Sequence, residues 1–222
     1  MGYFERLPAG YAAEPARRYP MVVFLHGAWE SGRHLGMIDG STTPGVRQRD
    51  LTRLVDPARG GDTPFVALFP QRCSLLLPPQ EMRHFIDHAI ATYRIDTRRI
   101  YLIGHSAGAA QIWDALPELA GRVAAAVTIS GFDTGRDMCA GREVAVWSLH
   151  AADDRSVPVA HSIAFTRRLQ ACAPAQAPRL SVFATGGHDI DEAVLDGRAR
   201  SGPATPDPLD TDVFAWLLQH VR

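Results

Sequence analysis

The chain has 222 residues, of which 46% are hydrophobic and 21% charged, a composition that is sufficient for one domain with a large core. Its formal net charge is −1, and its basic residues are spread along the whole length, so neither a nucleic acid nor a strongly charged protein partner is indicated. All 23 basic residues are arginine, which excludes chemistry that depends on lysine, such as Schiff-base formation or phosphate binding by a P-loop lysine.

The three cysteines, Cys73, Cys139 and Cys172, form neither a C-x-x-C pair nor the spacing of a zinc site, so we expect no metal and no disulfide framework. A single bridge, for instance between Cys139 and Cys172, stays open, but so few cysteines favour a reducing compartment. No apolar run approaches the ~20 residues of a membrane span, and residues 1–10 lack the apolar core of a signal peptide. We therefore expect a cytoplasmic protein without a membrane partner, with secretion as the alternative if a leader has been removed.

Short apolar runs alternate with segments of helical periodicity along the chain. Residues 3–7 are typical of an edge strand, and six further runs are typical of strands buried on both faces, at 21–25, 65–69, 99–103, 123–129, 144–149 and 180–184. Helices are expected at 79–93, 109–116, 159–171 and 212–221, with a short one near 46–54. We expect Pro117 to end the second of these helices and Val221 to lie on the apolar face of the last.

This order of elements predicts one α/β domain over residues 1–222, with a doubly wound, mostly parallel sheet. In such a sheet the functional groups lie at the carboxyl ends of the strands. The loops at 30–62 and 194–210 are expected to set the specificity of the site, and residues 197–208 to be mobile.

The sequence GHSAG at residues 104–108 matches the pattern G-x-S-x-G between an expected strand and an expected helix. A serine on so sharp a turn has a strained backbone and projects its hydroxyl above the sheet, which requires small neighbouring residues. The same turn directs the N–H of Ala107 and the positive end of the helix to the place where an oxyanion would form. A chance match is the alternative, and the strand-turn-helix context weighs against it. We predict that Ser106 is a nucleophile.

A serine nucleophile requires a base, and the base requires an orienting carboxylate. His188 follows the strand expected at 180–184 and is preceded by two glycines, while Asp154 follows the strand expected at 144–149. The order Ser, Asp, His along the chain is the one expected when the nucleophile stands on such a turn. Asp153 is the alternative carboxylate, but neighbouring side chains in an extended loop point opposite ways, so only one of the two faces the histidine. We favour Asp154.

The loop at residues 26–32 is expected to supply a second oxyanion donor, the N–H of Ala28 or, less favoured, that of Trp29. We expect His26 to order this loop and the side chain of Trp29 to contact the substrate and narrow its pocket. His105 is interpreted as a structural residue that points away along the turn, with a contact to the substrate as the alternative.

Other polar residues receive structural interpretations. His84 and His88 lie four residues apart on an expected helix, but no third ligand is evident, so no metal site is predicted there. Asp189 and Asp191 are interpreted as solvated acids of a loop.

Three segments, YPMVVFLHGA at residues 19–28, YRIDTRRIYLIGHSAG at 93–108 and VAVWSLHAADDRSVP at 144–158, resemble the α/β-hydrolase superfamily. The similar branch contains carboxylesterases, dienelactone-hydrolase-like, poly(hydroxyalkanoate)-depolymerase-like and feruloyl-esterase-like proteins and "predicted peptidases". The resemblance runs from about residue 19 to the last helix and implies an α/β-hydrolase fold.

The resemblance also implies a serine hydrolase that cleaves a small-molecule carboxylic ester and needs no cofactor. Two departures matter: Trp29 stands where the branch often has glycine, and residues 133–142 are too few for a cap domain. The cysteine nucleophile of true dienelactone hydrolases is absent, which argues against that activity. A peptidase or amidase with the same residues, and a catalytically silent binding protein on the same fold, are the alternatives.

Overall fold

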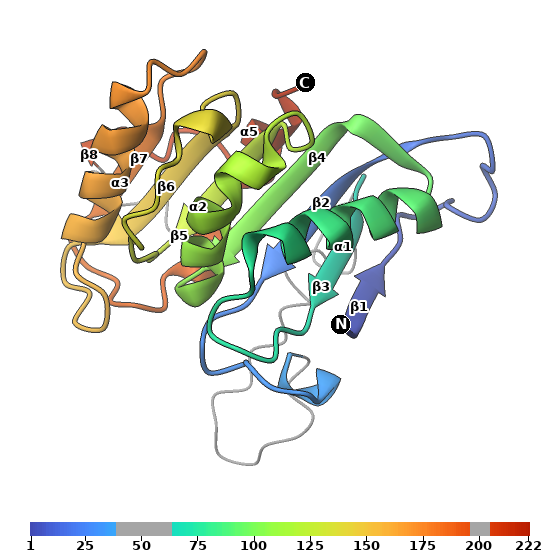
Figure 1. The fold of residues 1–222 in the computed structure, drawn as a ribbon, viewed down its shortest axis with the longest axis horizontal. Coiled ribbons are helices and arrows are strands. Elements are labelled where there is room, and N and C mark those ends of the chain that lie inside the picture. The colour runs from blue at the N-terminus through green and yellow to red at the C-terminus, as the bar shows by residue number, and fades with distance from the viewer. Residues whose placement is uncertain (39–63, 196–204) are drawn as a thin grey trace.

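The computed structural model describes residues 1–38, 64–195 and 205–222 of the chain. The helix expected near 46–54 and most of the two loops expected to set specificity lie outside these residues. The described strands form an eight-stranded sheet in the order β1-β3-β2-β4-β5-β6-β7-β8 (Figure 1). Their bounds are β1 Tyr3–Arg6, β2 Tyr19–Leu25, β3 Val66–Pro70, β4 Ile95–His105, β5 Ala125–Ile129, β6 Ala145–Ala151, β7 Arg179–Phe183 and β8 Thr205–Pro206.

The two outermost strands differ in direction from the rest of the sheet. β1 pairs with β3 and β8 pairs with β7 in the antiparallel direction, whereas all the pairs between β3 and β7 are parallel. The carboxyl ends of the parallel strands therefore meet at one edge of the sheet, and the loops that follow them lie together there.

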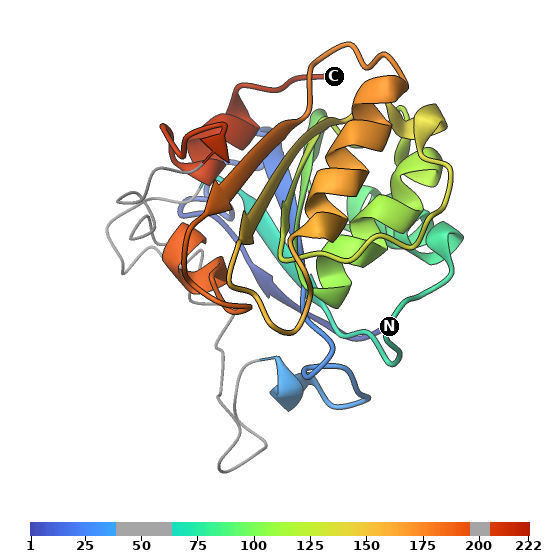
Figure 2. The ribbon, with the colours of Figure 1, turned by 90° about the vertical axis from the view of Figure 1, so that its left-hand side faces the viewer.

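Helices cover both faces of the sheet, as a doubly wound fold requires (Figure 2). The helices are α1 Pro79–Thr92, α2 Ala107–Leu119, α3 Ala160–Ala171, α4 Asp191–Leu195 and α5 Val213–Leu218, with short 3-10 turns at η1 Leu35–Met37 and η4 Cys139–Gly141. Apolar residues of α1, α2 and α3 share one buried cluster with the sheet, and those of α4 and α5 share another. The mostly parallel α/β sheet predicted from the sequence is confirmed, and the described residues include no cap domain.

Most predicted elements agree with the structure to within a few residues, but two end points are wrong. Pro117 lies inside α2, which continues to Leu119. A proline this close to the end removes a single backbone hydrogen bond, and Leu116 and Leu119, both fully buried, hold the last turn against the core. The last helix, α5, ends at Leu218, and Val221 beyond it is 47% exposed rather than part of the apolar face.

Two short elements, α4 and β8, were not predicted, because five and two residues are too few to show a periodicity. β4 also begins four residues before the strand expected at 99–103. Its first residues pair with β2 alone, since β5 joins only from Tyr101 onward. Partly exposed, polar residues are accordingly tolerated at its start.

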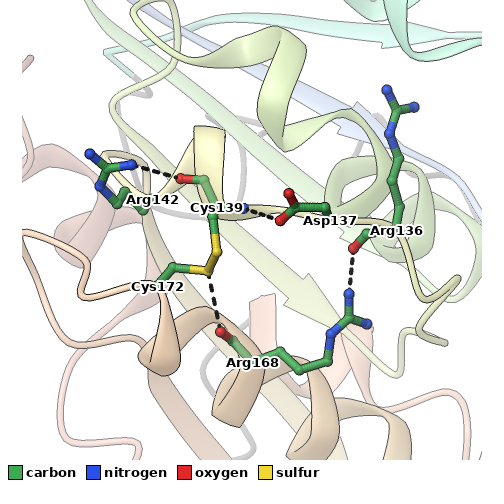
Figure 3. The surroundings of a disulfide bond; sticks show 6 residues. All are labelled: Arg136, Asp137, Cys139, Arg142, Arg168 and Cys172. Atoms are coloured by element: carbon green, nitrogen blue, oxygen red, sulfur yellow. Dashed lines mark hydrogen bonds between the residues drawn. A yellow bond between two sulfur atoms is a disulfide. The ribbon is translucent and has the colours of Figure 1, made fainter.

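The structure contains the one disulfide that the sequence left open, between Cys139 and Cys172. Figure 3 shows that it joins η4 to the C-terminal end of α3, with Arg142 donating a hydrogen bond to the carbonyl oxygen of Cys139. Cys73 is free and exposed. Among the described residues, no helix combines the length and the hydropathy that a membrane crossing would need.

Candidate active site

Ser106 stands on the sharp turn between β4 and α2, as the G-x-S-x-G pattern predicts. Its backbone has φ 53° and ψ −116°, a left-handed conformation that is costly for a residue with a side chain. The turn is possible because two glycines flank it. A Cβ atom on Gly104 would lie 2.5 Å from the carbonyl carbon of Gly108, and one on Gly108 would lie 1.9 Å from the carbonyl oxygen of Leu25. The turn, the start of α2 and the end of β2 are thus in backbone contact.

The side chains of Ser106, His188 and Asp154 form one chain of hydrogen bonds. Oγ of Ser106 lies 2.9 Å from Nε2 of His188, and Nδ1 of His188 lies 2.8 Å from Oδ2 of Asp154. The three residues follow β4, β7 and β6, so the carboxyl edge of the sheet brings together groups that are far apart in the sequence. In this arrangement Nδ1 of His188 donates to the carboxylate, and Nε2 can accept the proton of the serine hydroxyl.

Asp154 is held in its ionised form by its surroundings. Burial opposes ionisation, but hydrogen bonds from the backbone N–H groups of Val157 and Ser156 and from His188 outweigh it and hold the pKa of Asp154 below its usual value. A carboxylate fixed in this way can orient an imidazole ring and stabilise the charge that forms on it.

Asp153, the alternative carboxylate, has a different contact. Its Oδ1 accepts a hydrogen bond of 2.8 Å from the backbone N–H of Gly187, the residue just before His188. Gly186 and Gly187 have φ values of 143° and 66°, which residues with side chains rarely adopt. Asp153 therefore anchors the turn that carries His188, whereas Asp154 contacts the imidazole itself.

His150 is a member of the site that the sequence analysis did not assign. It lies fully buried near the end of β6, where its Nδ1 accepts from the hydroxyl of Ser162 at 2.7 Å. Its Nε2 donates to the carbonyl oxygen of Val157 at 2.9 Å and lies 3.2 Å from Oδ2 of Asp154. Burial lowers the pKa of His150, so the neutral ring that these contacts need is the stable form. A histidine in an otherwise apolar strand end was the available signal.

The two predicted oxyanion donors lie on elements that touch each other. Ala107 is the first residue of α2, where backbone N–H groups have no acceptor within the helix. Ala28 lies in the loop after β2, and a Cβ atom on the preceding Gly27 would be only 3.3 Å from Nδ1 of His105 and 3.7 Å from Cβ of Ser106. The loop thus passes directly beside Ser106, with little space for a side chain at Gly27.

His26 orders this loop, as the sequence analysis expected. Its buried ring donates from Nδ1 to the carbonyl oxygen of Gly27 at 2.7 Å, and its Nε2 accepts from the backbone N–H of Arg72 at 3.0 Å. Burial, and then the charge of Arg72, lowers the pKa of His26 to about 3. His26 is neutral at ordinary pH and is a structural residue. Arg72 itself, fully buried, was missed by the sequence analysis.

Trp29 is 82% exposed in the loop after β2, and its contact with the substrate stays a prediction. The interpretation of His105 needs correction. His105 is buried and does not point away from the site, since its Nε2 donates to the carbonyl oxygen of His188 at 2.9 Å and its ring centre lies 5.0 Å from that of His188. His105 supports the loop of the candidate base from behind, which leaves little of it for a substrate to touch.

The interpretation of Asp191 as a solvated acid is wrong. The first turn of α4 directs it inward, where it is fully buried with Oδ1 3.8 Å from Nε2 of His105. Asp189 is exposed, as expected. Among the described residues, His105, Asp189 and Asp191 form the one group whose spacing could suit a metal ion, since their ligand atoms lie within 4.8 Å of one another. Because Nε2 of His105 carries the proton donated to His188, that nitrogen is not a metal ligand in this arrangement.

Known proteins place these observations in a family. Residues 79–197, more than half of the chain, match the family model described as Phospholipase/Carboxylesterase. The comparison with curated proteins found no match. Among solved structures, a thermostable esterase is 23% identical with a TM-score of 0.75; the alignment covers 99% of this chain and 59% of that one, so this chain spans less than two thirds of the length of that esterase.

Two other solved structures extend the comparison. Esterase PE8 is 19% identical with a TM-score of 0.59, covering 90% of this chain and 97% of that one. The Pyrococcus horikoshii acylaminoacyl peptidase is 12% identical with a TM-score of 0.60, covering 89% of this chain and 38% of that one. Identities this low show a common fold and no more. Together with the family model, they show that the chain belongs to the phospholipase/carboxylesterase family of α/β-hydrolases.

Proposed function

We propose that this hydrolase cleaves a small-molecule carboxylic ester through an acyl-enzyme on Ser106. The observation that carries the proposal is the continuous chain of hydrogen bonds from Ser106 through His188 to Asp154. A serine hydroxyl alone is a weak nucleophile, and a neutral imidazole within hydrogen-bond distance of it is what activation requires.

In the proposed reaction, Oγ of Ser106 attacks the ester carbonyl while Nε2 of His188 takes the hydroxyl proton. The N–H groups of Ala28 and Ala107 hold the oxyanion of the tetrahedral intermediate, and Asp154 stabilises the imidazolium. The intermediate collapses as His188 gives its proton to the leaving alcohol. Water then attacks the acyl carbon while His188 takes its proton, the bond to Oγ of Ser106 breaks, and His188 returns the proton to Oγ, which releases the acid and restores the serine. No step needs a metal or an organic cofactor.

The family description favours an ester over an amide, and two of the similar structures named above are esterases. The same residues could cleave an amide, and the similarity to an acylaminoacyl peptidase keeps that alternative under test. A silent binding protein would have no need for the costly backbone conformation of Ser106.

We further propose that the substrate is small and that Trp29 contacts it from the exposed loop after β2. Its exposed indole follows the proposed donor Ala28 directly in the chain and offers a flat apolar surface to the acid or the alcohol. Short acyl chains are expected because the described residues include no cap that would enclose a long one.

The test combines labelling with turnover. A fluorophosphonate probe should label the wild-type protein and not Ser106→Ala, and wild type should hydrolyse p-nitrophenyl esters with a preference for short acids, unaffected by EDTA. Ser106→Ala should lose about six orders of magnitude in kcat. Turnover by Ser106→Ala above 1% of wild type, or loss of activity in EDTA that zinc restores, would contradict the proposal. Faster cleavage of peptide than of ester substrates would favour the peptidase.

A further inference from the structure

Arg72 is an arginine whose side chain is fully buried in the loop that follows β3, in contact with the loop that carries Ala28. Its guanidinium contacts backbone carbonyl oxygens. Nη1 donates to Leu75 at 2.5 Å and reaches Ala107 at 3.5 Å, while Nη2 donates to His26 and reaches Gly27 at 3.4 Å. One side chain thus connects three segments that surround Ser106: the loop after β2, the loop after β3 and the first turn of α2.

These contacts fix the orientation of the peptide group between Gly27 and Ala28. In a trans peptide, the C=O and the following N–H point in opposite directions. The carbonyl oxygen of Gly27 is held by Nδ1 of His26 at 2.7 Å and faces the guanidinium of Arg72. The N–H of Ala28, which belongs to the same peptide, must therefore point away from Arg72.

Arg72 also determines which nitrogen of His26 carries the proton. The backbone N–H of Arg72 donates to Nε2 of His26, so the proton of the neutral ring lies on Nδ1, where it is donated to Gly27. The side chain and the backbone of Arg72 therefore act on the same carbonyl, one directly and the other through the imidazole.

Burial lowers the pKa of Arg72 only to about 10, so the guanidinium stays charged at neutral pH. A fixed positive charge in a buried position acts over a longer range than one in water, because the surroundings screen it less. The nearby carboxylate of Glu30 offsets part of this charge, so the main effect of Arg72 is on the orientation of the peptide between Gly27 and Ala28.

We propose that Arg72 is a positioning residue of the oxyanion site: its guanidinium holds the carbonyls of His26 and Gly27 and so directs the N–H of Ala28 toward the reacting oxygen. This role rests on the proposed ester hydrolysis and adds to it a residue that touches no substrate.

The test compares Arg72→Lys and Arg72→Met with wild type. A lysine keeps the charge but cannot hold several carbonyls in one plane, and a methionine keeps only the apolar stem. Removing one oxyanion donor typically costs about 100-fold or more in kcat, so we expect a loss of that order for Arg72→Met and a smaller one for Arg72→Lys, with KM changed less than about threefold. Affinity for an alkylboronic acid, which forms a tetrahedral adduct with an activated serine, should fall in parallel with kcat.

Arg94 offers a matched control. Like Arg72, it donates to a backbone carbonyl, that of Tyr11. The Nε atoms of both arginines are buried without a hydrogen-bond partner among the described residues. It precedes β4, at the opposite end of the strand from Ser106. Arg94→Met should lower the thermal midpoint but leave kcat unchanged.

A folded Arg72→Lys or Arg72→Met with wild-type kcat, or an equal loss of kcat in Arg94→Met, would overturn the proposal. Should Arg72→Met not fold, Arg72→Lys carries the kinetic test. A crystal structure of either folded variant gives a readout independent of activity: the Gly27 carbonyl should have turned from its wild-type position, and an unchanged peptide would also overturn the proposal. If fluorophosphonate does not label wild type, the proposed function is contradicted instead. The position of the Gly27 carbonyl in the crystal structure of a variant then still decides whether Arg72 orients this peptide.

Discussion

His150 and Asp154 are in contact: Nε2 of His150 lies 3.2 Å from Oδ2, the same oxygen that accepts from Nδ1 of His188. One carboxylate oxygen thus lies between two imidazole rings, one buried and one at the candidate site. Because His150 is also bonded to Ser162 and Val157, its position is fixed by β6 and α3 rather than by Asp154. The buried histidine therefore holds the carboxylate of Asp154 in place.

We predict that His150→Phe weakens both the fold and the site. The substitution leaves the hydroxyl of Ser162 and the carbonyl of Val157 without a partner, and one such buried group costs about 1–3 kcal/mol. Asp154 also loses a donor, so its charge is less dispersed and favours the imidazolium of His188 more strongly. The acid limb of kcat/KM should move to higher pH. Ser162→Ala, which leaves the contact with Asp154 in place, is the control and should shift the pH profile less; equal shifts would contradict this account.

The two neighbouring acids, Asp153 and Asp154, should differ sharply in kinetic effect. Asp154→Asn places an amide against His188, which favours the wrong tautomer and cannot stabilise the imidazolium, so we expect kcat to fall by about four orders of magnitude. Asp153→Asn removes a charged acceptor from the N–H of Gly187 and should cost about tenfold, through a looser turn. The variants should be assayed together, after circular dichroism shows both to be folded. A larger loss in Asp153→Asn would transfer the orienting role to Asp153.

The sequence predicted the parts of the site that depend on local patterns. A turn that forces a serine into a left-handed conformation needs small residues at fixed offsets, and the glycines at 104 and 108 are visible in the sequence for that reason. Asp154 and His188 each follow an apolar run, and the rule that parallel strands end at one edge was enough to bring them together. These inferences needed no knowledge of which side chains pack against each other.

Arg72, His150 and Asp191 could not be found in this way. Each is a polar residue whose burial depends on how separate elements pack; only His150 carried a local signal, its place at the end of an apolar strand, and that signal does not show which groups it contacts. Asp191 was misinterpreted because α4, which turns it inward, has only five residues. The contact of Trp29 with the substrate stays a prediction, because an exposed side chain shows no protein contact that would settle its role.

The buried, neutral His26 predicts that the fold is sensitive to mild acid. Burial lowers its pKa from the ordinary value of 6.5 to about 3, so between these values the unfolded chain binds a proton that the folded chain does not. Its contribution to stability is complete above pH 6.5 and falls by about 1.4 kcal/mol per pH unit as the pH drops toward 3. Urea unfolding of wild type and His26→Asn between pH 4 and 7 should show a flatter dependence in the variant. His84→Asn, at an exposed position, should keep the wild-type slope; matching slopes in all three proteins would rule out His26 as the source.

The disulfide between Cys139 and Cys172 should stabilise the fold without taking part in the reaction. It closes a loop with a sequence separation of 33 residues, for which the chain-entropy model gives about 3–4 kcal/mol. The bond fastens the end of α3 to η4, and Gly141 in η4 lies so close to α2 that a Cβ atom would be 2.6 Å from the backbone of Leu116.

The double variant Cys139→Ser with Cys172→Ser should therefore unfold at a clearly lower temperature, while kcat at 20 °C stays near wild type, since neither cysteine touches Ser106, His188 or Asp154. Cys73→Ser, which removes the free and exposed thiol, is the control and should change neither property. An unchanged melting temperature in the double variant would mean that the bond does not form in solution. Because disulfides are rare in reducing compartments, an intact bond in protein taken from its native cells under thiol-blocking conditions would contradict the cytoplasmic location expected from the sequence and favour secretion.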